Sequence, residues 1–277
     1  MDVTQPTVKV DLQGVPETLL WTLYHRALEA RRPDAVLRDP VAVELVDRID
    51  YPFEERFGAG RLAQWQALRV RAFDREIRRF LAAHPGGTVV ALGEGLETQF
   101  WRVDDGRVRW VSVDLPETVE IRRRLLPDDA RRHVIARSAL DFAWMDEVDA
   151  AGGVLVTAQG LLMYFEPGDV HRLIAACAGR FRGSDLLFDA VPRWLAEAAQ
   201  KAPDRDPSAY RPPRWTWTVD RAERGRIQGI SGVERVRAIP LARGRGVVHG
   251  FLLPLATRVP VVEHALPTVL QATFRGA

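Results

Sequence analysis

The chain has 277 residues, of which 47% are hydrophobic and 27% are charged, and its formal net charge is only +2. This composition is ordinary for a globular protein with a sizeable core, so neither disulfides nor a structural metal is needed for stability. Cys177 is the single cysteine, which excludes an intrachain disulfide and favours a reducing cytoplasm. No apolar run approaches the roughly 20 residues that span a bilayer, and the N-terminus lacks the features of a signal peptide, so we expect no membrane association.

The positive charge is almost entirely arginine, because Lys9 and Lys201 are the only lysines. Heavy arginine use can mark a surface that binds phosphate or nucleic acid. Here the arginines alternate with acids along helical segments, as in residues 74–79, which is typical of a solvated helix face. We therefore expect no nucleic-acid partner.

The first part of the chain has the pattern of helices. Apolar residues recur at helical spacing from Val15 to Ala30, and Pro16 suits the first turn of that helix. A second helix is expected from Asp39-Pro40 through Val46, and the longest helical pattern runs from Arg61 to Ala83. The sequence Pro85-Gly86-Gly87 ends it.

The pattern then changes to short apolar runs that alternate with helical segments. This alternation predicts an α/β fold with a mostly parallel sheet and helices on both faces. In chain order, the expected strands are Thr88 to Leu92, Val108 to Val113, His133 to Ala136, Gly153 to Thr157 and Ser184 to Asp189, and the expected helices are Thr98 to Arg102, Pro116 to Leu126 and Pro167 to Arg180.

After Pro192 the periodicity weakens. Residues from about Ala202 to Pro213 are rich in Pro, Asp and Arg and are predicted to form a loop. Val233 to Pro240 and Val247 to Pro254 have the pattern of two late strands, which we interpret as a candidate antiparallel pair. The tail that follows has little periodicity.

A glycine turn between the first two expected strands carries most of the functional information. A nicotinamide-dinucleotide turn has glycine at three places, G-x-G-x-x-G; Gly93 and Gly95 fill the first two, but Thr98 stands at the third. Asp114 ends the second strand about twenty residues past the turn, where a carboxylate accepts ribose hydroxyls. The pattern favours S-adenosyl-L-methionine, which has no phosphate. The alternative is a plain strand–turn–helix in which Asp114 caps the next helix.

Several ordered motifs together resemble the leucine carboxyl methyltransferase family, and in particular its bacterial branch of polyketide-biosynthesis (tetracenomycin-type) O-methyltransferases. The similarity extends from about Thr18 to Arg258. It is carried by VVALGEGLETQFWR (Val89–Arg102), VDLPETVEIRRR (Val113–Arg124), QGLLMYF (Gln159–Phe165), DP (Asp39-Pro40), ALRVRAFD (Ala67–Asp74), SALDF (Ser138–Phe142) and FDAVP (Phe188–Pro192).

The resemblance implies a class I S-adenosylmethionine-dependent methyltransferase, a single Rossmann-like α/β domain with a mostly parallel seven-stranded sheet and helices on both faces. Within residues 1–277, the resemblance implies a helical N-terminal lid over 1–85 and a cofactor-binding βαβ core over 86–192. A cap segment over 193–232 and the final strands and tail over 233–277 would follow.

The same resemblance implies residues for the methionine and ribose parts of the cofactor. Arg69 would hold the methionine carboxylate, to which a guanidinium fork is suited. Gly93 and Gly95 would line the methionine part, and Asp114 would accept the ribose hydroxyls. The methyl transfer would leave S-adenosyl-L-homocysteine.

Further residues are implied at the adenine and at the amino group. Ser138 and Ala139, with Asp141 close by, would edge the adenine, and Gln159 would face the sulfonium or the amino group. The family places Glu where Gln159 stands; an amide still accepts a hydrogen bond from the ammonium, but it supplies no counter-charge. The turn also carries Glu97 where the common form has Asp.

The acceptor end of the site is less defined, because no residue stands out as a general base. A carboxylate acceptor is ionised at neutral pH and needs none, whereas a phenol, with a pKa near 10, would benefit from one. Tyr164 follows the fourth expected strand at the carboxyl edge of the sheet, and we hypothesise that it touches the acceptor. Tyr24 and His25, on the first helix, are further candidates. The alternatives are a core or rim aromatic and an ordinary helix-surface histidine.

Three tryptophans, Trp194, Trp215 and Trp217, flank the irregular segment after the fifth strand. They could sandwich a flat polyketide-like ring, or they could pack a small core of their own. The histidines are scattered without ligand spacing, so no metal site is predicted, and the absence of G-x-S-x-G argues against a serine hydrolase.

The sequence therefore favours a cytoplasmic S-adenosylmethionine-dependent methyltransferase that acts on an oxygen, carboxylate or phenolic, of a small secondary metabolite. Two alternatives stay open. One is a catalytically silent or regulatory S-adenosylmethionine-binding protein of the same fold, motivated by Gln159 and the altered turn. The other is an NAD-dependent oxidoreductase, which Thr98 disfavours. The oligomeric state is not indicated.

Overall fold

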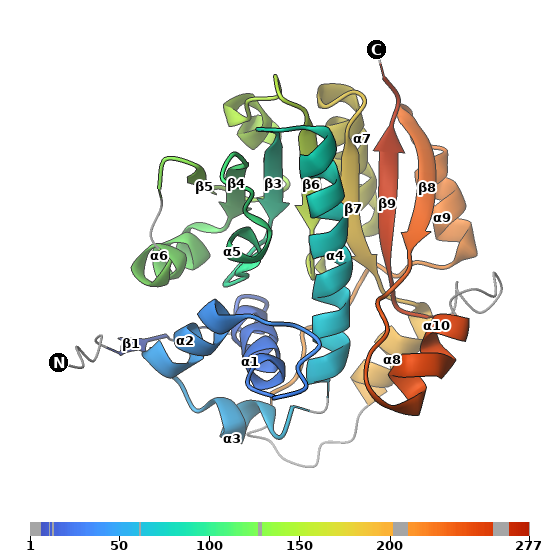
Figure 1. Ribbon diagram of the computed structural model, residues 1–277. Helices are drawn as coiled ribbons and strands as arrows, with labels where there is room; N and C mark the ends of the chain where they lie inside the picture. The colour runs from blue at the N-terminus through green and yellow to red at the C-terminus, as the bar shows by residue number, and fades with distance from the viewer. Residues whose placement is uncertain are drawn as a thin grey trace.

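A seven-stranded sheet lies above a layer of short helices (Figure 1). One long helix, α4 (Ala63–Ala83), lies beside the sheet and extends down to the helical layer. The computed structural model describes residues 7–10, 12, 14–60, 62–126, 129–201, 210–256 and 266–276. Among these residues, no helix combines the length and apolar character that crossing a membrane requires.

The strand order of the large sheet is β5-β4-β3-β6-β7-β9-β8. Strands β3 to β7 are parallel, and β9 is antiparallel to both of its neighbours. The prediction of a mostly parallel, seven-stranded α/β sheet is thus confirmed. Its strands are β3 (Thr88–Leu92), β4 (Arg109–Asp114), β5 (Arg132–Ala136), β6 (Val154–Ala158), β7 (Asp185–Ala190), β8 (Val233–Ile239) and β9 (Thr268–Phe274).

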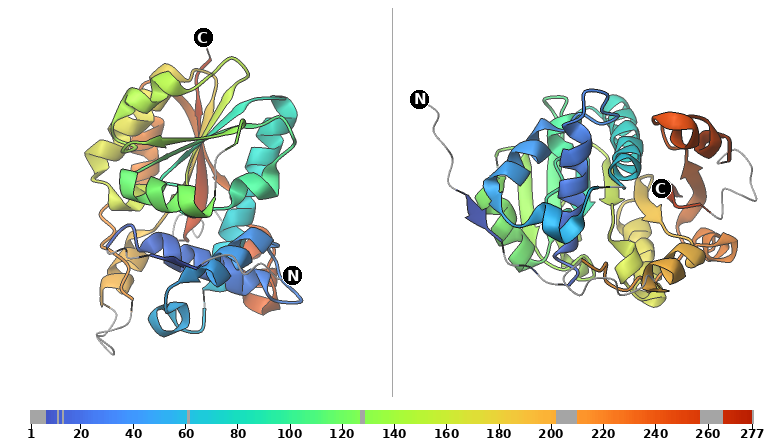
Figure 2. Two further views of the ribbon diagram at one scale, coloured as in Figure 1. Left: turned by 90° about the vertical axis from the view of Figure 1, so that its left-hand side faces the viewer. Right: turned by 90° about the horizontal axis from the view of Figure 1, so that it is seen from below.

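Helices cover both faces of this sheet, as Figure 2 shows edge-on. Alternate residues of β3 supply the two faces: Val89 and Ala91 pack toward α4 and α5, and Val90 and Leu92 pack toward η1, α7 and α9. A strand buried on both sides must be apolar throughout, which is why its pattern was legible in the sequence. The helices of the sheet are α4 (Ala63–Ala83), α5 (Gln99–Val103), α6 (Pro116–Leu125), η1 (Phe142–Glu147), η2 (Leu162–Tyr164), α7 (Pro167–Arg180), α8 (Arg193–Lys201) and α9 (Arg221–Gln228).

The layer below the sheet is built from α1 (Thr18–Ala30), α2 (Pro40–Arg48) and α3 (Phe53–Phe57), with a two-stranded ribbon of β1 (Val8–Lys9) and β2 (Ile49–Asp50). Its start signals act as the sequence predicted: the Asp39 side chain accepts from the Ala42 amide at 3.1 Å, and Pro40 occupies the first turn of α2. Apolar side chains of α1, α2 and α6 share one cluster. The layer is therefore packed onto the sheet domain.

One expected strand was wrong. Residues Val248–Leu252 form a π-helical turn (η3) that continues into α10 (Leu253–Ala256), and the antiparallel partner of β8 is β9. A short apolar run has no periodicity that separates a buried strand from a helix, so the run near Val247 was misassigned. The predicted loop of 202–213 lies largely outside the described residues.

Candidate functional site

The site lies where the order of strands reverses. β3 pairs with β4 on one side and β6 on the other, so the chain leaves their carboxyl ends in opposite directions and a crevice opens between them. Two adjoining pockets occupy this crevice, one of about 200 Å³ and a smaller one of about 60 Å³. The two share Thr18, Leu19, Gly93, Gly95 and Gly160.

The glycine turn after β3 forms the wall between the pockets. Gly93 and Gly95 have φ values of +57° and +56°, a region that disfavours any residue with a Cβ. A Cβ on Gly95 would stand 2.9 Å from the Cβ of Leu19. Arg122 of α6 holds the turn from behind, because its guanidinium donates to the carbonyl of Gly95 at 2.6 Å. The sequence therefore needs glycine here for backbone shape and for close packing with α1.

Replacing Gly95 with alanine is expected to lower the free energy of unfolding by about 1–2 kcal/mol, because the new side chain is strained at positive φ and displaces Leu19. The affinity for S-adenosylhomocysteine should fall with it. Chemical denaturation and titration calorimetry measure the two effects. Gly179→Ala, at a helical glycine with open space around it, is the matched control. If Gly95→Ala and Gly179→Ala had the same stability and the same affinity for S-adenosylhomocysteine, the proposed role of the turn would be contradicted.

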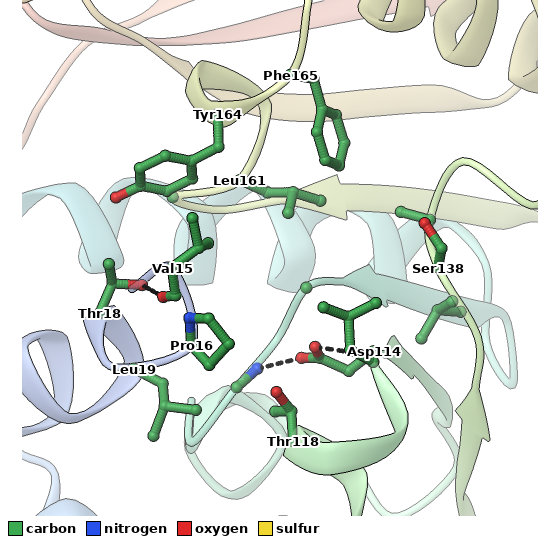
Figure 3. Close-up of a pocket in the computed structure, with 16 residues that line it drawn as sticks. Val15, Pro16, Thr18, Leu19, Asp114, Thr118, Ser138, Leu161, Tyr164 and Phe165 are labelled. Carbon is green, nitrogen blue, oxygen red and sulfur yellow. Dashed lines mark hydrogen bonds between the residues drawn. The ribbon is translucent and has the colours of Figure 1, made fainter. Parts of the chain in front are cut away.

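Asp114, at the end of β4, lines the larger pocket and braces the turn (Figure 3). Its carboxylate accepts from the Gly95 amide at 2.7 Å and from the Leu115 amide at 2.8 Å. Burial raises the pKa of Asp114, and the two backbone donors oppose that rise. A carboxylate oxygen accepts more than one hydrogen bond, so the group can brace the turn and still bind hydroxyls in the pocket.

The two residues expected at the adenine edge, Ser138 and Ala139, do line the larger pocket, and Ser138 lies at the end opposite Tyr164 (Figure 3). Asp141 does not. Its exposed side chain pairs with Arg137 at 2.6 Å and caps the turn at Ala143. The family resemblance implied Asp141 close to the adenine, but its charge is satisfied outside the pocket.

Two residues that line the smaller pocket each carry a buried polar atom without a hydrogen-bond partner. Arg69 of α4 uses one guanidinium nitrogen in an ion pair with Asp189, while its buried Nε has no partner. Gln159 donates its amide to Glu97 at 2.8 Å, while its Oε1 is buried and unpartnered. An unpaired donor group and an unpaired acceptor in one cavity are complementary to a carboxylate and an ammonium, the two charges of a free amino acid.

The acceptor candidates separate into two groups. Tyr164 lines the larger pocket, and burial raises the pKa of its phenol, so it is protonated at neutral pH. Tyr24 and His25 line neither pocket, since Tyr24 stacks on Phe53 and the ring of His25 lies 4.6 Å from that of Trp21. His25 bonds the Trp21 carbonyl at 2.8 Å, and burial lowers the pKa of its imidazole. Both residues belong to the core of the helical layer, because helical periodicity does not say which neighbour a side chain meets.

The three tryptophans also have different surroundings. Trp217 is a core residue that packs on Phe188 and donates to Glu223 at 2.8 Å, away from both pockets. Trp194 is exposed on α8. Trp215 lines neither pocket; its buried indole Nε1 faces the Tyr164 hydroxyl, and this interaction opposes the rise in the pKa of Tyr164.

The segment 210–217, here called the strap, explains the position of Trp215. At one end the Tyr210 amide donates to the carbonyl of Arg56 in the helical layer, at 3.1 Å. At the other end the Thr216 amide donates to the carbonyl of Met163, after β6, at 2.8 Å. The strap thus connects the helical layer to the loop that carries Tyr164. The hydroxyl of Tyr210 is buried and lacks a hydrogen-bond partner, and burial raises its pKa.

A buried ionic cluster joins the helical layer to the glycine turn. Arg102 of α5 contacts Asp39 at 2.6 Å, Asp74 at 2.9 Å and Glu97 at 2.8 Å. Arg26 of α1 contacts Asp39 at 3.4 Å and Glu97 at 3.1 Å. Burial opposes ionisation of Glu97, but Arg26 and Arg102 lower its pKa to about 2. Sequence reasoning missed this cluster, whose members lie up to 76 positions apart. Asp39, Asp74, Glu97 and Arg102 all stand in the family motifs quoted above, but nothing in the sequence indicated that they meet.

The chain is similar to known proteins in sequence and in fold. The sequence profile described as Leucine carboxyl methyltransferase matches residues 20–178. Tetracenomycin polyketide synthesis O-methyltransferase TcmP of Streptomyces glaucescens is 36% identical over 69% of this chain and 71% of that protein. S-adenosyl-L-methionine-dependent methyltransferase dpfgK of Gibberella zeae is 28% identical over 90% of this chain and 91% of that protein. The solved CurJ carbon methyltransferase has a TM-score of 0.53 at 12% identity, covering 94% of this chain and 68% of that one.

The fold and the site define a class I S-adenosylmethionine-dependent methyltransferase. The chain belongs to the leucine carboxyl methyltransferase family, whose profile matches more than half of its length. The resemblance seen in the sequence motifs is thereby confirmed, as is the cofactor class.

Proposed function

We propose that this protein is an O-methyltransferase that methylates a carboxylate of a small, polyketide-like metabolite. The cofactor supplies an electrophilic methyl group on a sulfonium. In this proposal, Asp114 binds the ribose hydroxyls, Ser138 and Ala139 edge the adenine, and Arg69 holds the methionine carboxylate. The helices α1–α3 act as a lid and residues 193–232 as a cap.

The pairing of the two pockets with the two ends of the cofactor supports these roles. The larger pocket is lined by Asp114 and, for the most part, by apolar residues, which suits the ribose and the base of a nucleoside. The smaller pocket is lined by Arg69 and Gln159, whose unpaired Nε and Oε1 suit the charges of an amino acid. Gly93 and Gly95 line both pockets, so the sulfonium is expected beside the turn.

The absence of a free base supports a carboxylate rather than a phenol. Among the described residues that line the pockets, the carboxylates are engaged: Asp114 with backbone amides, Glu94 with Arg122 at 3.0 Å, and Glu97 with two arginines. Tyr164 is protonated at neutral pH because burial raises its pKa. A carboxylate is already ionised and attacks without losing a proton, whereas a phenol needs one removed.

The test pairs each candidate aromatic acid with its phenolic analogue and follows S-adenosylhomocysteine and product mass. We expect products whose methyl group is released by alkaline hydrolysis, as an ester requires, and a kcat/KM that is flat from about pH 6 to 9, well above a carboxylic pKa. An alkali-stable product whose rate rises with pH would favour a phenol. Binding of S-adenosylhomocysteine without turnover on any acceptor would favour the silent binding protein.

A substitution at Trp215 tests the acceptor end of the site. The buried indole N–H of Trp215 has no close hydrogen bond and lies beside the Tyr164 hydroxyl, so we expect an acceptor oxygen that enters beside Tyr164 to bind it in the complex. Trp215→Phe removes this donor and keeps an aromatic ring; it should raise the KM for the acceptor about tenfold and leave the Kd for S-adenosylhomocysteine unchanged. Steady-state kinetics and calorimetry measure these. Trp217→Phe is the control, since losing its bond to Glu223 should lower stability without changing KM. An unchanged KM for Trp215→Phe would exclude this contact.

A further inference from the structure

The orientation of the Gln159 amide is fixed by a single neighbour. Its Nε2 donates at 2.8 Å to Oε2 of Glu97. Ionised Glu97 can only accept hydrogen bonds, so the NH₂ end of the amide must face it. The carbonyl end, Oε1, then faces the other way and is left buried without a partner. Gln159 and Glu97 both line the smaller pocket.

The charge behind this amide is also fixed. Besides Gln159, Glu97 accepts from the Thr98 amide at 2.9 Å and contacts Arg26 and Arg102. The cluster of Arg26, Arg102, Asp39, Asp74 and Glu97 contains three carboxylates and two guanidiniums, so it carries one net negative charge in a buried setting. A cation in the adjacent pocket would compensate that charge.

We propose that Glu97 and Gln159 form one unit that binds the α-ammonium group of the cofactor. Gln159 accepts a hydrogen bond from the ammonium through Oε1, and Glu97, a positioning residue, fixes the amide and supplies the negative charge from behind it. The glutamine is therefore not a weakened version of the family's glutamate. A second carboxylate at position 159 would stand within hydrogen-bond distance of an ionised Glu97 and repel it.

The sign of the effect of Gln159→Glu tests this inference. If position 159 simply needs a counter-charge, the family residue should bind S-adenosylhomocysteine as tightly as the wild type or more tightly. If Glu97 already supplies the charge, we expect Gln159→Glu to bind at least tenfold more weakly near pH 8 and to recover as the pH falls and the pair takes up a proton. Gln159→Met, which removes the acceptor without adding charge, should also lose about tenfold. The exchanged pair, Glu97→Gln with Gln159→Glu, restores one carboxylate and one amide and should regain most of the affinity lost by Gln159→Glu.

Calorimetry with 5′-methylthioadenosine provides the control, because this ligand has the nucleoside but neither amino-acid charge. Its Kd should be the same in the wild type, Gln159→Glu and Gln159→Met. An unchanged or higher affinity of Gln159→Glu for S-adenosylhomocysteine at pH 8 would overturn the proposal. A parallel loss of both ligands in Gln159→Met would also overturn it, since that result reports a structural role. These measurements involve no acceptor, so they stand or fall separately from the proposed carboxylate methylation.

Discussion

Replacing Arg102 with leucine is expected to lower the free energy of unfolding by about 3–5 kcal/mol, the largest stability effect that we predict for a single polar side chain here. Arg102 is buried and contacts three carboxylates, those of Asp39, Asp74 and Glu97. Without it Asp39 and Glu97 would share Arg26, and Asp74 would keep the Gln99 amide but lose its contact with a guanidinium. At least one carboxylate would then be charged and without a cationic partner in a dry interior. Urea denaturation of the apoprotein at pH 7 measures the effect.

An exposed arginine provides the matched control for this change. Arg109 pairs with Asp149 at the surface, where both side chains are about half exposed. Solvent and salt screen such a pair, so Arg109→Leu should change the free energy of unfolding by less than about 1 kcal/mol. If the two variants lost similar stability, the buried cluster would not be what holds the helical layer to the glycine turn.

Replacing Asp114 with alanine is expected to raise the Kd for S-adenosylhomocysteine about 100-fold or more. The variant loses two functions together: the carboxylate that we assign to the ribose, and the acceptor that holds the Gly95 amide at 2.7 Å. Each hydrogen bond to a charged group is worth about 1.5–3 kcal/mol, and two of them account for that factor. Calorimetry measures the Kd, and Asp114→Asn should lose less because one amide oxygen still accepts.

Asp141→Ala tests whether the second carboxylate that the family pattern placed near the cofactor contributes to binding. The family pattern implied Asp141 beside the adenine, but its side chain is exposed and bound to Arg137. We therefore expect the affinity for S-adenosylhomocysteine to be unchanged in this variant. A loss comparable to that of Asp114→Ala would mean that Asp141 turns into the pocket when the cofactor binds.

The centre of the sheet was predictable because β3 and β6 are buried at every residue, which leaves runs such as Val89 to Leu92 with no polar residue. The glycine turn was predictable because positive φ restricts the residue type. The run near Val247 was not, since its composition suits a strand as well as a buried helix. The missing strand, Thr268–Phe274, followed a proline-rich stretch, and its partner β8 lies about 30 positions earlier, so no local signal joined them.

The site residues likewise fall into those that local sequence patterns predicted and those that they did not. Residues on the turn and at strand ends were found from local pattern, because topology brings the ends of β3, β4 and β6 together. The partners of those residues were not found. Asp189 meets Arg69 across 120 positions, and Glu97 meets Gln159 across 62. These contacts depend on packing between layers, which a single sequence does not encode at any fixed spacing.

The cluster around Arg102 also limits how this protein can be recombined. Residues before position 86 contribute Arg26, Asp39 and Asp74, and those after it contribute Glu97 and Arg102. Consider a chimaera whose first 85 residues come from a relative with different charges at these positions. Its helical layer would then lack the charged partners of Glu97 and Arg102, even if its apolar surfaces packed well against the sheet. A graft that keeps the charges of this buried cluster paired must therefore transfer all five side chains together.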